Sequence, residues 1–578
     1  MANFKTPGVY IQEISTLPAS IAPVSTAIPA FIGYTEKREK DGETLAANTP
    51  VRITSLLEFR EIFGGAFNEN LTVTLTDPVD PADDTIIAVE AATERSPYTL
   101  YYHMTMYFGN GGGPCYVVSV GTYTTTAIPA DPSTLIQVSE LQQGLVSVEQ
   151  EDEVTLLVVP EAILLAVPGR GTINDDMLAQ CNRLQDRFAI MDAAVLGGTV
   201  NDDGIGFRAD VGTSDLKYGA SYYPSLRTTL DLNFENSDVA ITDSRASAIY
   251  NNSTLAVILD GVPSAFATGT VTIGSNPTGA TITVGGIALV EGSEWTVTID
   301  DGAATAASLA SAIDGLADVN AVSAGSVVTI TAAVTGISGN SITLNTTHSA
   351  NAAVSGGTLT GGVDAEPADK TLGNNIVNEI RKNFEVVLYP SATMAGVYAR
   401  VDFDRGVWKA PANVSLRLVN EPAVLVTPDE QGGLNIDATS GKSINVIRQF
   451  TGRGTLAWGA RTLAGNDNEW RYIPVRRLFI FVEESVKKAT EFVVFEPNDA
   501  NTWLKVKTMT ENFLAKLWRD GALAGATPGE AFFVRVGLGQ TMTALDILEG
   551  RMNVEIGMAA VRPAEFIILK FSHKLQES

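Results

Sequence analysis

The pattern of apolar and polar residues changes along the chain, and it is clearest between residues 154 and 191. A continuous apolar run covers residues 154–159, a helical stretch covers 176–186, and a second apolar run covers 188–191. Strand, helix and strand at this spacing are typical of a βαβ unit whose parallel strands are buried on both faces. The sequence therefore predicts an α/β domain that begins shortly after residue 150.

This α/β domain is interrupted. Further strands are expected at 217–223 and 384–389, but residues 262–364 between them carry Thr/Val alternation, many glycines and one Ala-rich helical stretch. Short alternating runs bounded by glycine indicate a small β-rich domain inserted into a loop of its host. We therefore predict a discontinuous α/β domain over 151–261 and 365–460.

The N-terminal part predicts a strand without a local partner. Residues 8–14 are β-prone and lie between Pro7 and a proline-rich stretch. We interpret residues 1–24 as an extended arm. Residues 25–150 combine β-prone runs with Gly-, Pro- and Thr-rich loops, which predicts a β-rich outer domain.

The C-terminal part, 461–560, contains a clear amphipathic helix at 502–520. Its apolar side chains recur at helical spacing, and lysine and arginine side chains fall on the other side. Such a helix commonly covers a sheet with a solvated basic face, and the same face is also suited to an acidic partner. In an extended conformation residues 566–571 place Ile567, Leu569 and Phe571 on one side, so they are predicted to form a short strand and 561–578 to be a second arm.

Charge is distributed unevenly. The chain has 578 residues, of which 39 are Lys or Arg and 66 are Asp or Glu, for a net charge of −27. This balance argues against a nucleic-acid partner, because phosphate backbones require concentrated Lys and Arg. Residues 246–369 contain no basic residue, whereas 461–578 carry 15 basic and 15 acidic residues. The acidic insertion suits a solvent-facing domain, and the neutral C-terminal part suits packing against other copies.

Targeting signals and a disulfide framework are not predicted. The N-terminus lacks the basic-then-apolar run of a secretory signal, and no stretch reaches the roughly 18 apolar residues of a membrane span. Cys115 and Cys181 are the two cysteines of the sequence, and one pair cannot form a disulfide framework that holds a chain of this length together. We expect a soluble protein with no direct membrane insertion.

No group of residues indicates catalysis. His103, His348 and His573 fall in three different predicted parts, and the two cysteines have no CxxC neighbour. The glycine cluster at 109–114 lacks the Lys-Ser/Thr of a phosphate loop and predicts a tight turn. We therefore predict no catalytic residue, no cofactor and no metal ligand.

A series of motifs nonetheless resembles the contractile tail sheath family, in the order found there and over nearly the whole chain except the insertion. The similarity is to single-chain sheaths of phage tails and phage-like injection systems. The motifs are Thr6–Ile14, Asn110–Val118, Asp186–Asp192, Tyr218–Pro224, Gly396–Asp402, Gly406–Asn413, Asn445–Arg448, Trp458–Thr462, Phe495–Asn498 and Val561–Phe566.

The resemblance implies a sheath core whose α/β domain is compared in topology with subtilisin, without its catalytic residues. It also implies that both arms are donated as strands to sheets in the C-terminal domains of neighbouring subunits, because main-chain pairing is indifferent to side-chain identity. The implied donor residues are Val9, Tyr10, Ile11 and Ile14 in the N-terminal arm and Phe566, Ile567, Ile568, Leu569 and Phe571 in the C-terminal arm.

The implied function is mechanical. Subunits assembled in the bacterial cytoplasm would polymerise helically, in six-fold rings, around an inner tube protein. Baseplate and terminal cap proteins would complete the particle. The extended sheath would be metastable and contract to drive the tube through a target envelope. We assign tube contact to Lys505, Lys516 and Arg519 on the amphipathic helix.

Two other functions remain open from the residues alone. The Thr/Gly-rich insertion is compatible with a surface adhesin, which would be monomeric and bind glycans or cells. The βαβ unit and scattered carboxylates are compatible with a hydrolase. Hollow helical tubes are expected only of a sheath.

Overall fold

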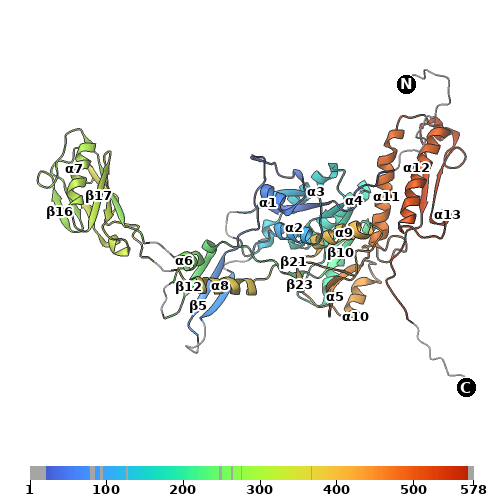
Figure 1. Cartoon of the computed structure of the whole chain (residues 1–578), viewed down its shortest axis with the longest axis horizontal. Coiled ribbons are helices and arrows are strands. Elements are labelled where there is room, and N and C mark those ends of the chain that lie inside the picture. The colour runs from blue at the N-terminus through green and yellow to red at the C-terminus, as the bar shows by residue number, and fades with distance from the viewer. Residues whose placement is uncertain are drawn as a thin grey trace, which may run out of the picture. The chain divides into compact units, whose positions relative to one another are not determined.

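The computed structural model describes residues 21–78, 85–91, 95–124, 128–246, 250–261, 264–274, 276–365 and 368–569 (Figure 1). The chain forms two compact units. The first comprises residues 1–67, 93–233 and 385–578, and the second comprises 68–92 and 234–384.

A nine-stranded sheet forms the centre of the first unit. Its order is β22 (Val414–Ser415), β25 (Gly454–Ala457), β24 (Ile444–Phe450), β10 (Gly219–Tyr223), β9 (Phe188–Asp192), β8 (Leu156–Val158), β1 (Pro29–Thr35), β7 (Cys115–Thr122) and β4 (Pro50–Ile53). The six strands from β24 to β7 pair in parallel, and β22, β25 and β4 pair antiparallel at the edges. The parallel strands are nearly all buried along their length, as expected for a sheet covered on both faces.

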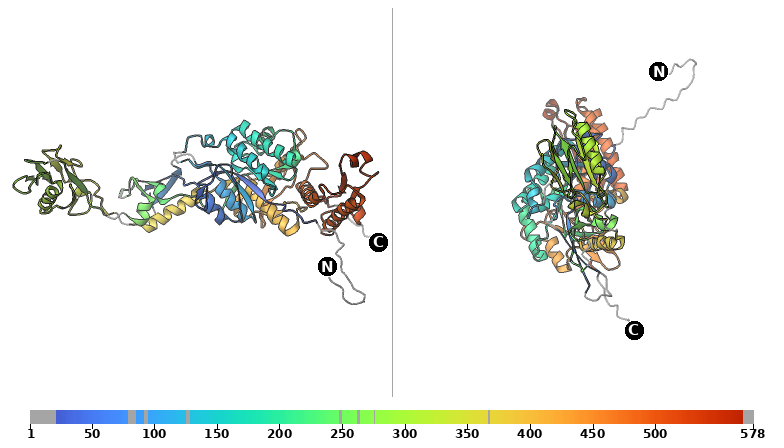
Figure 2. Two further views of the ribbon diagram at one scale, coloured as in Figure 1. Left: turned by 90° about the horizontal axis from the view of Figure 1, so that it is seen from above. Right: turned by 90° about the vertical axis from the view of Figure 1, so that its left-hand side faces the viewer.

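Helices cover both faces of this sheet. The side chain of Ile32 on β1 faces Gly144 of α3 (Val138–Ser147), while the neighbouring Phe31 contacts Tyr107 of α2 (Leu100–Gly109) at 4.9 Å between ring centroids. Successive strand residues point to opposite faces, so α3 and α2 lie on opposite sides of the sheet. Helix α4 (Val167–Leu184) packs with α3 and α5 (Val200–Asp210), and α9 (Ser391–Arg405) packs with α2 (Figure 2).

The predicted βαβ unit is confirmed, because β8, α4 and β9 follow one another and the two strands pair in parallel. The expected boundary at residue 150 does not divide the sheet. Strand β1 lies between β7 and β8 and hydrogen-bonds to both. All of its residues are buried, as expected of a strand inside a sheet that is covered on both faces. The strand expected at 384–389 is β21 (Val387–Leu388), which joins β11 (Leu226–Thr228) and β23 (Val419–Pro422) in a separate antiparallel sheet.

A buried carboxylate links β1 to α2. Glu161, in the 3-10 helix Pro160–Leu164, is fully buried, and its Oε2 accepts a hydrogen bond from the Tyr34 N–H at 2.8 Å. Its Oε1 accepts from the Thr99 and Leu100 N–H groups at 2.8 and 3.1 Å. Burial raises the pKa of Glu161 to about 7, and the three N–H donors oppose that rise. One side chain thus satisfies three backbone donors from two elements.

The second unit contains a four-stranded sheet in the order β13 (Ser253–Thr254), β12 (Val239–Asp243), β5 (Leu71–Thr76) and β6 (Ile86–Ala91). Strand β12 pairs in parallel with β5, and the outer pairs are antiparallel. Helices α6 (Leu255–Asp260) and α8 (Lys370–Asn383) pack on each other, and α8 contacts β6.

Residues 264–365 have an apolar core of their own, centred on the fully buried Trp295. The helix expected near 304–313 is α7 (Gly302–Asp314), and the Thr/Val alternation at 281–284 and 327–330 is confirmed as strand. The segment 295–299 forms only an isolated bridge. The strands are β14 (Thr268–Ile273), β15 (Thr281–Val284), β16 (Ile287–Val290), β17 (Val319–Ala324), β18 (Val327–Ala332), β19 (Leu344–Thr346) and β20 (Ala352–Val354).

We predict that residues 265–363 can be excised without unfolding the rest of the chain. Ala265 and Val363 exchange two backbone hydrogen bonds, of 2.9 and 3.2 Å, so the two ends of the excised segment are adjacent and a short glycine linker can replace it. The free energy of unfolding of the remainder should stay within about 1 kcal/mol of the intact chain in denaturant titrations. Loss of the cooperative transition would contradict this independence.

Four helices and two strands form the C-terminal region. They are α11 (Ile473–Thr490), α12 (Ala500–Arg519), α13 (Pro528–Ala531), β26 (Phe532–Val536), α14 (Ala544–Leu548) and β27 (Val554–Met558). The predicted amphipathic helix is confirmed as α12, whose N-cap Asp499 accepts from the N–H groups of Asn501 and Thr502. The remaining elements of the first unit are β2 (Glu39–Lys40), β3 (Glu43–Thr44), α1 (Leu56–Phe63) and α10 (Pro428–Asn435).

Candidate interaction surface

The C-terminal core is built from two helices and the segment that precedes β1. Leu478 of α11 and Leu514 of α12 are fully buried in it, and Ile21 is only 3% exposed within the same core. The Val24 N–H donates to Ser485 Oγ at 3.2 Å, and Arg477 donates to the Thr26 carbonyl at 2.7 Å. The chain therefore enters its first sheet strand from the side of α11.

The sheet in this region has only two strands. Residues 532–536 of β26 pair antiparallel with residues 554–558 of β27, in the register Phe532 with Met558 and Val536 with Val554. Within the residues that the structure describes, each of these strands has a strand partner on one edge only. Two unpaired rows of N–H and C=O groups form a template for a further strand.

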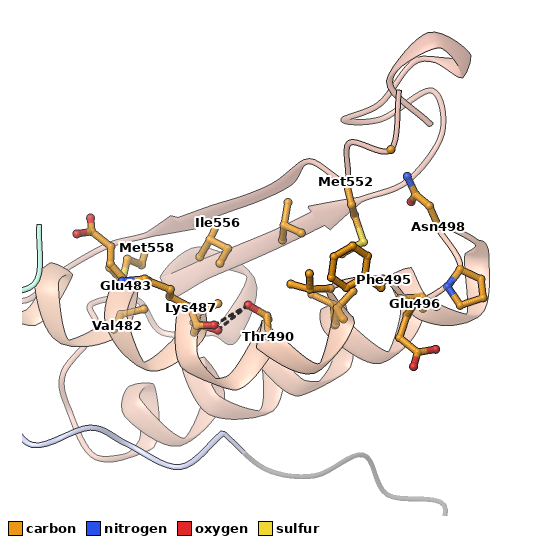
Figure 3. A pocket seen from close by; sticks show the side chains of 18 of the residues that line it. Val482, Glu483, Lys487, Thr490, Phe495, Glu496, Asn498, Met552, Ile556 and Met558 are labelled. Carbon is orange, nitrogen blue, oxygen red and sulfur yellow. Dashed lines mark hydrogen bonds between the residues drawn. The ribbon is translucent and has the colours of Figure 1, made fainter. Parts of the chain in front are cut away.

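An apolar groove of about 890 Å³ lies beside β27 (Figure 3). Ile556 and Met558 line it from the strand, and Val482, Lys487 and Thr490 line it from α11. These side chains come from a strand with one open edge and from helix α11. A segment lying in the groove would therefore meet both an open edge and an apolar wall.

The loop between α11 and α12 borders this groove with exposed apolar residues. Val494 is 64% exposed, and the side chain of Phe495 is fully exposed. Phe495 has a φ of 71°, in the left-handed region that residues with a Cβ rarely adopt. Exposed apolar residues at such a backbone conformation are typical of a surface that is covered in a complex.

The C-terminal segment is apolar and uncovered. Phe566, Ile567, Ile568 and Leu569 are 67, 79, 81 and 72% exposed. The strand expected at 566–571 is not formed over 566–569, because none of the strands that the structure describes pairs with this segment. Phe571 lies outside the described residues. So do the N-terminal residues named above: Val9, Tyr10, Ile11 and Ile14.

The three basic residues assigned to α12 are exposed. At about 100° per residue, Lys505, Lys516 and Arg519 fall within roughly 60° of one another around the helix axis. They therefore form one basic face, which lies roughly 60–140° around the helix axis from the side chains of Val506 and Phe513 that enter the core.

Within the described part of the chain, the histidines and the two cysteines lie on separate elements or loops. His103 on α2 is buried, and burial lowers its pKa to about 3. Cys115 and Cys181 are buried and form no disulfide. Among the described residues, no cluster of three or more His, Cys, Asp or Glu side chains could hold a metal ion. His573 lies outside them.

Sequence reasoning missed α11 and the groove. The signal for α11 was present, because Val475, Leu478, Val482 and Val486 recur at helical spacing after Pro474. The groove had no signal, since it depends on how α11, the 493–498 loop and β27 come together. None of the helices described here is long and apolar enough to cross a bilayer.

The fold and this surface define a mixed α/β multidomain protein with an open C-terminal sheet edge. Residues 465–574 match the family model of the phage tail sheath C-terminal domain. The tail sheath protein of Burkholderia phage BcepMu is 30% identical over 140 residues, which cover 23% of this chain and 29% of that protein. The match to this curated relative thus spans less than a third of its length.

Two solved structures are similar to the chain from end to end. The sheath of the extracellular contractile injection system PVC, in its contracted state, is 25% identical with a TM-score of 0.52 and covers 99% of both chains. The helical sheath of the anti-feeding prophage, also contracted, is 27% identical with a TM-score of 0.52, over 99% of this chain and all of that one. Residues 465–574 thus match the C-terminal domain of phage tail sheaths, and the chain as a whole is similar to the sheaths of contractile injection systems.

Proposed function

We propose that this chain is the structural subunit of a contractile sheath that polymerises helically around an inner tube and contracts to drive that tube through a target envelope. The observation that carries this proposal is the similarity to contracted sheaths over 99% of both chains. The family is structural, so the proposed role is mechanical and not enzymatic. The α/β domain, which the resemblance compares with subtilisin in topology, acts here as a scaffold.

We infer that copies are joined by strand addition at the C-terminal sheet. Strand β27, which has one open edge, lines the apolar groove with Ile556 and Met558, and residues 566–569 offer four consecutive exposed apolar side chains. An added strand gives main-chain hydrogen bonds to the edge and side chains to the groove. Because the segment from Ile21 to Thr26 runs along α11, an N-terminal arm also leaves from this region. Val9, Tyr10, Ile11 and Ile14 are its proposed pairing residues.

Strand addition accounts for both cohesion and movement. About five hydrogen bonds per arm, at roughly 0.5–1.5 kcal/mol net each, contribute about 2.5–7.5 kcal/mol. A subunit that gives two arms and receives two is held cooperatively in an open helical lattice. Arms that stay paired with their neighbours while the bodies rotate allow a rearrangement without dissociation. The proposal also includes a metastable extended state and contacts of the sheath with a baseplate and a terminal cap. Residues 262–364 are proposed to be the outward-facing surface domain of each subunit.

The basic face of α12 is proposed to contact the tube. Replacing Lys505, Lys516 and Arg519 together with glutamine should weaken co-sedimentation with the tube protein by about tenfold or more, because each exposed ion pair contributes up to about 1 kcal/mol. Folding stability should change little, since all three side chains are exposed. Lys507→Gln, on another face of α12, is the matched control. Equal binding by the triple variant would assign the tube contact elsewhere.

Electron microscopy of the purified chain tests the function most simply. A sheath subunit forms hollow helical tubes. Monomers that bind glycans or cells would instead support an adhesin, and turnover of peptide or ester substrates by monomers would support a hydrolase.

A further inference from the structure

One carboxylate fixes the chain immediately before the exposed C-terminal segment. Glu565 accepts hydrogen bonds from Arg461 Nε at 2.9 Å and Arg461 Nη2 at 2.6 Å, a bidentate ion pair. Asn435 Nδ2 also donates a hydrogen bond to Glu565, at 2.8 Å, and the Tyr472 hydroxyl donates another, at 3.1 Å. Burial would raise the pKa of Glu565, but these donors hold it below its ordinary value. The next residue, Phe566, is 67% exposed.

Arg461 is itself fixed to the nine-stranded sheet. Its side chain is only 4% exposed. The Arg461 N–H donates to Asn445 Oδ1 at 2.7 Å, and Asn445 Nδ2 donates to the Arg461 carbonyl at 2.8 Å. Asn445 lies on β24, and its Nδ2 also donates to the Ser221 carbonyl of β10 at 3.1 Å. A continuous series of hydrogen bonds therefore runs from Glu565 to two central strands.

The preceding residues are tied to a different part of the first unit. Ala524 N–H donates to the Ala559 carbonyl at 2.7 Å, and Val561 N–H donates to the Ala522 carbonyl at 3.2 Å. Residues 559–561 thus follow the segment after α12, and four residues later Glu565 binds the sheet domain. A segment that must carry load needs a fixed root, and a bidentate Arg–carboxylate pair whose arginine is buried is among the strongest polar anchors available.

We propose that Glu565 is a positioning residue that clamps the root of the C-terminal arm to the nine-stranded sheet through Arg461, Asn435 and Tyr472. Tension on the arm then reaches β24 and β10 directly and bypasses the two-stranded sheet β26–β27. The clamp is a property of the single chain. Its role in transmitting force rests on the proposed sheath function.

Chymotryptic cleavage after Phe566 in the dissociated full-length chain tests the clamp. A protease needs the flanking residues to leave their anchors. Arg461→Gln keeps the cleaved sequence unchanged and should raise the rate of release of peptide 567–578, measured by mass spectrometry, about tenfold, as expected for about 1.4 kcal/mol of lost anchoring. Tyr472→Phe should raise it less. Glu469→Gln is the control, because its exposed side chain makes no hydrogen bond or ion pair with the described residues.

Two checks keep this test decisive. Cleavage after the buried Phe188 reports global unfolding, so the result for Arg461→Gln is interpreted only under conditions in which that site stays resistant. Arg461→Lys and Tyr472→Phe weaken the anchoring of Glu565 less than Arg461→Gln does. If all three variants release the peptide at the wild-type rate, there is no clamp.

The transmission of force is tested separately on assembled tubes. Arg461→Gln sheaths should remain extended under conditions in which wild-type sheaths contract, whereas Glu469→Gln sheaths should contract normally. Normal contraction of the Arg461→Gln sheaths would overturn the transmission route. Failure of the wild-type chain to form tubes would instead overturn the sheath function and leave the proteolysis result standing.

Discussion

A chain that ends after Glu565 is expected to fold normally and to form no tubes. Residues 566–569 are 67–81% exposed, so their removal takes little from the single chain. In a lattice joined by strand addition, the same removal takes away about 2.5–7.5 kcal/mol of binding free energy for each arm. This loss is repeated at every subunit. Sedimentation and electron microscopy measure the loss of polymer, and thermal unfolding of the dissociated chain should shift by no more than about 2 °C.

A matched pair of point variants separates main-chain pairing from apolar contact. Leu569→Pro removes one N–H donor and favours a different backbone geometry, whereas Leu569→Val keeps an apolar, β-prone residue. The proline variant should polymerise far less than the valine variant at the same concentration. If both form tubes equally well, residue 569 does not contribute to a shared strand.

The second large effect is expected in the centre of the first unit. Glu161→Ala removes the acceptor of three buried N–H groups, those of Tyr34, Thr99 and Leu100. Each unsatisfied buried donor costs about 1–3 kcal/mol, so the free energy of unfolding at pH 7 should fall by about 3 kcal/mol or more. Chemical denaturation measures this loss. Glu43→Ala, at an exposed position on β3, should change it by less than about 0.5 kcal/mol.

The same variant predicts a pH dependence with a definite sign. Because burial raises the pKa of Glu161 to about 7, from an ordinary value of 4.5, the folded chain binds this proton more tightly than the unfolded chain. The part of the Glu161 contribution that comes from its raised pKa is therefore complete below pH 4.5 and is lost as the pH rises from 4.5 through about 7. The stability difference between wild type and Glu161→Ala should shrink by about 3 kcal/mol over this range. A difference that grows with pH would contradict the raised pKa.

Much of the fold could be predicted where local pattern and tertiary environment agree. The apolar run before residue 160, the helix after it and the strand at 188 are confirmed, because strands buried on both faces leave a continuous apolar signature. Helix α12 was predictable from its single apolar stripe and its Asp499 cap. The separate core of residues 264–365 agrees with the change of composition there.

Features that depend on distant pairings could not be predicted. Strand β1 joins β8 across more than 120 residues, so no local pattern reveals that residues before and after 150 share one sheet. The anchoring of Glu565 joins residues about 100 positions apart, and the sequence shows only an acidic residue before an apolar run. Residues 566–569 are an apolar, β-prone run, yet none of the described strands pairs with them.

A reconstruction of the assembled polymer by electron cryo-microscopy, at a resolution that traces the main chain, tests the shared-strand account most directly. We expect strands of two other copies, carrying residues 9–14 and 566–571, to extend the sheet β26–β27, with one of them occupying the groove beside Ile556. Terminal segments that return to their own subunit, with the β27 edge left unpaired between neighbours, would contradict it.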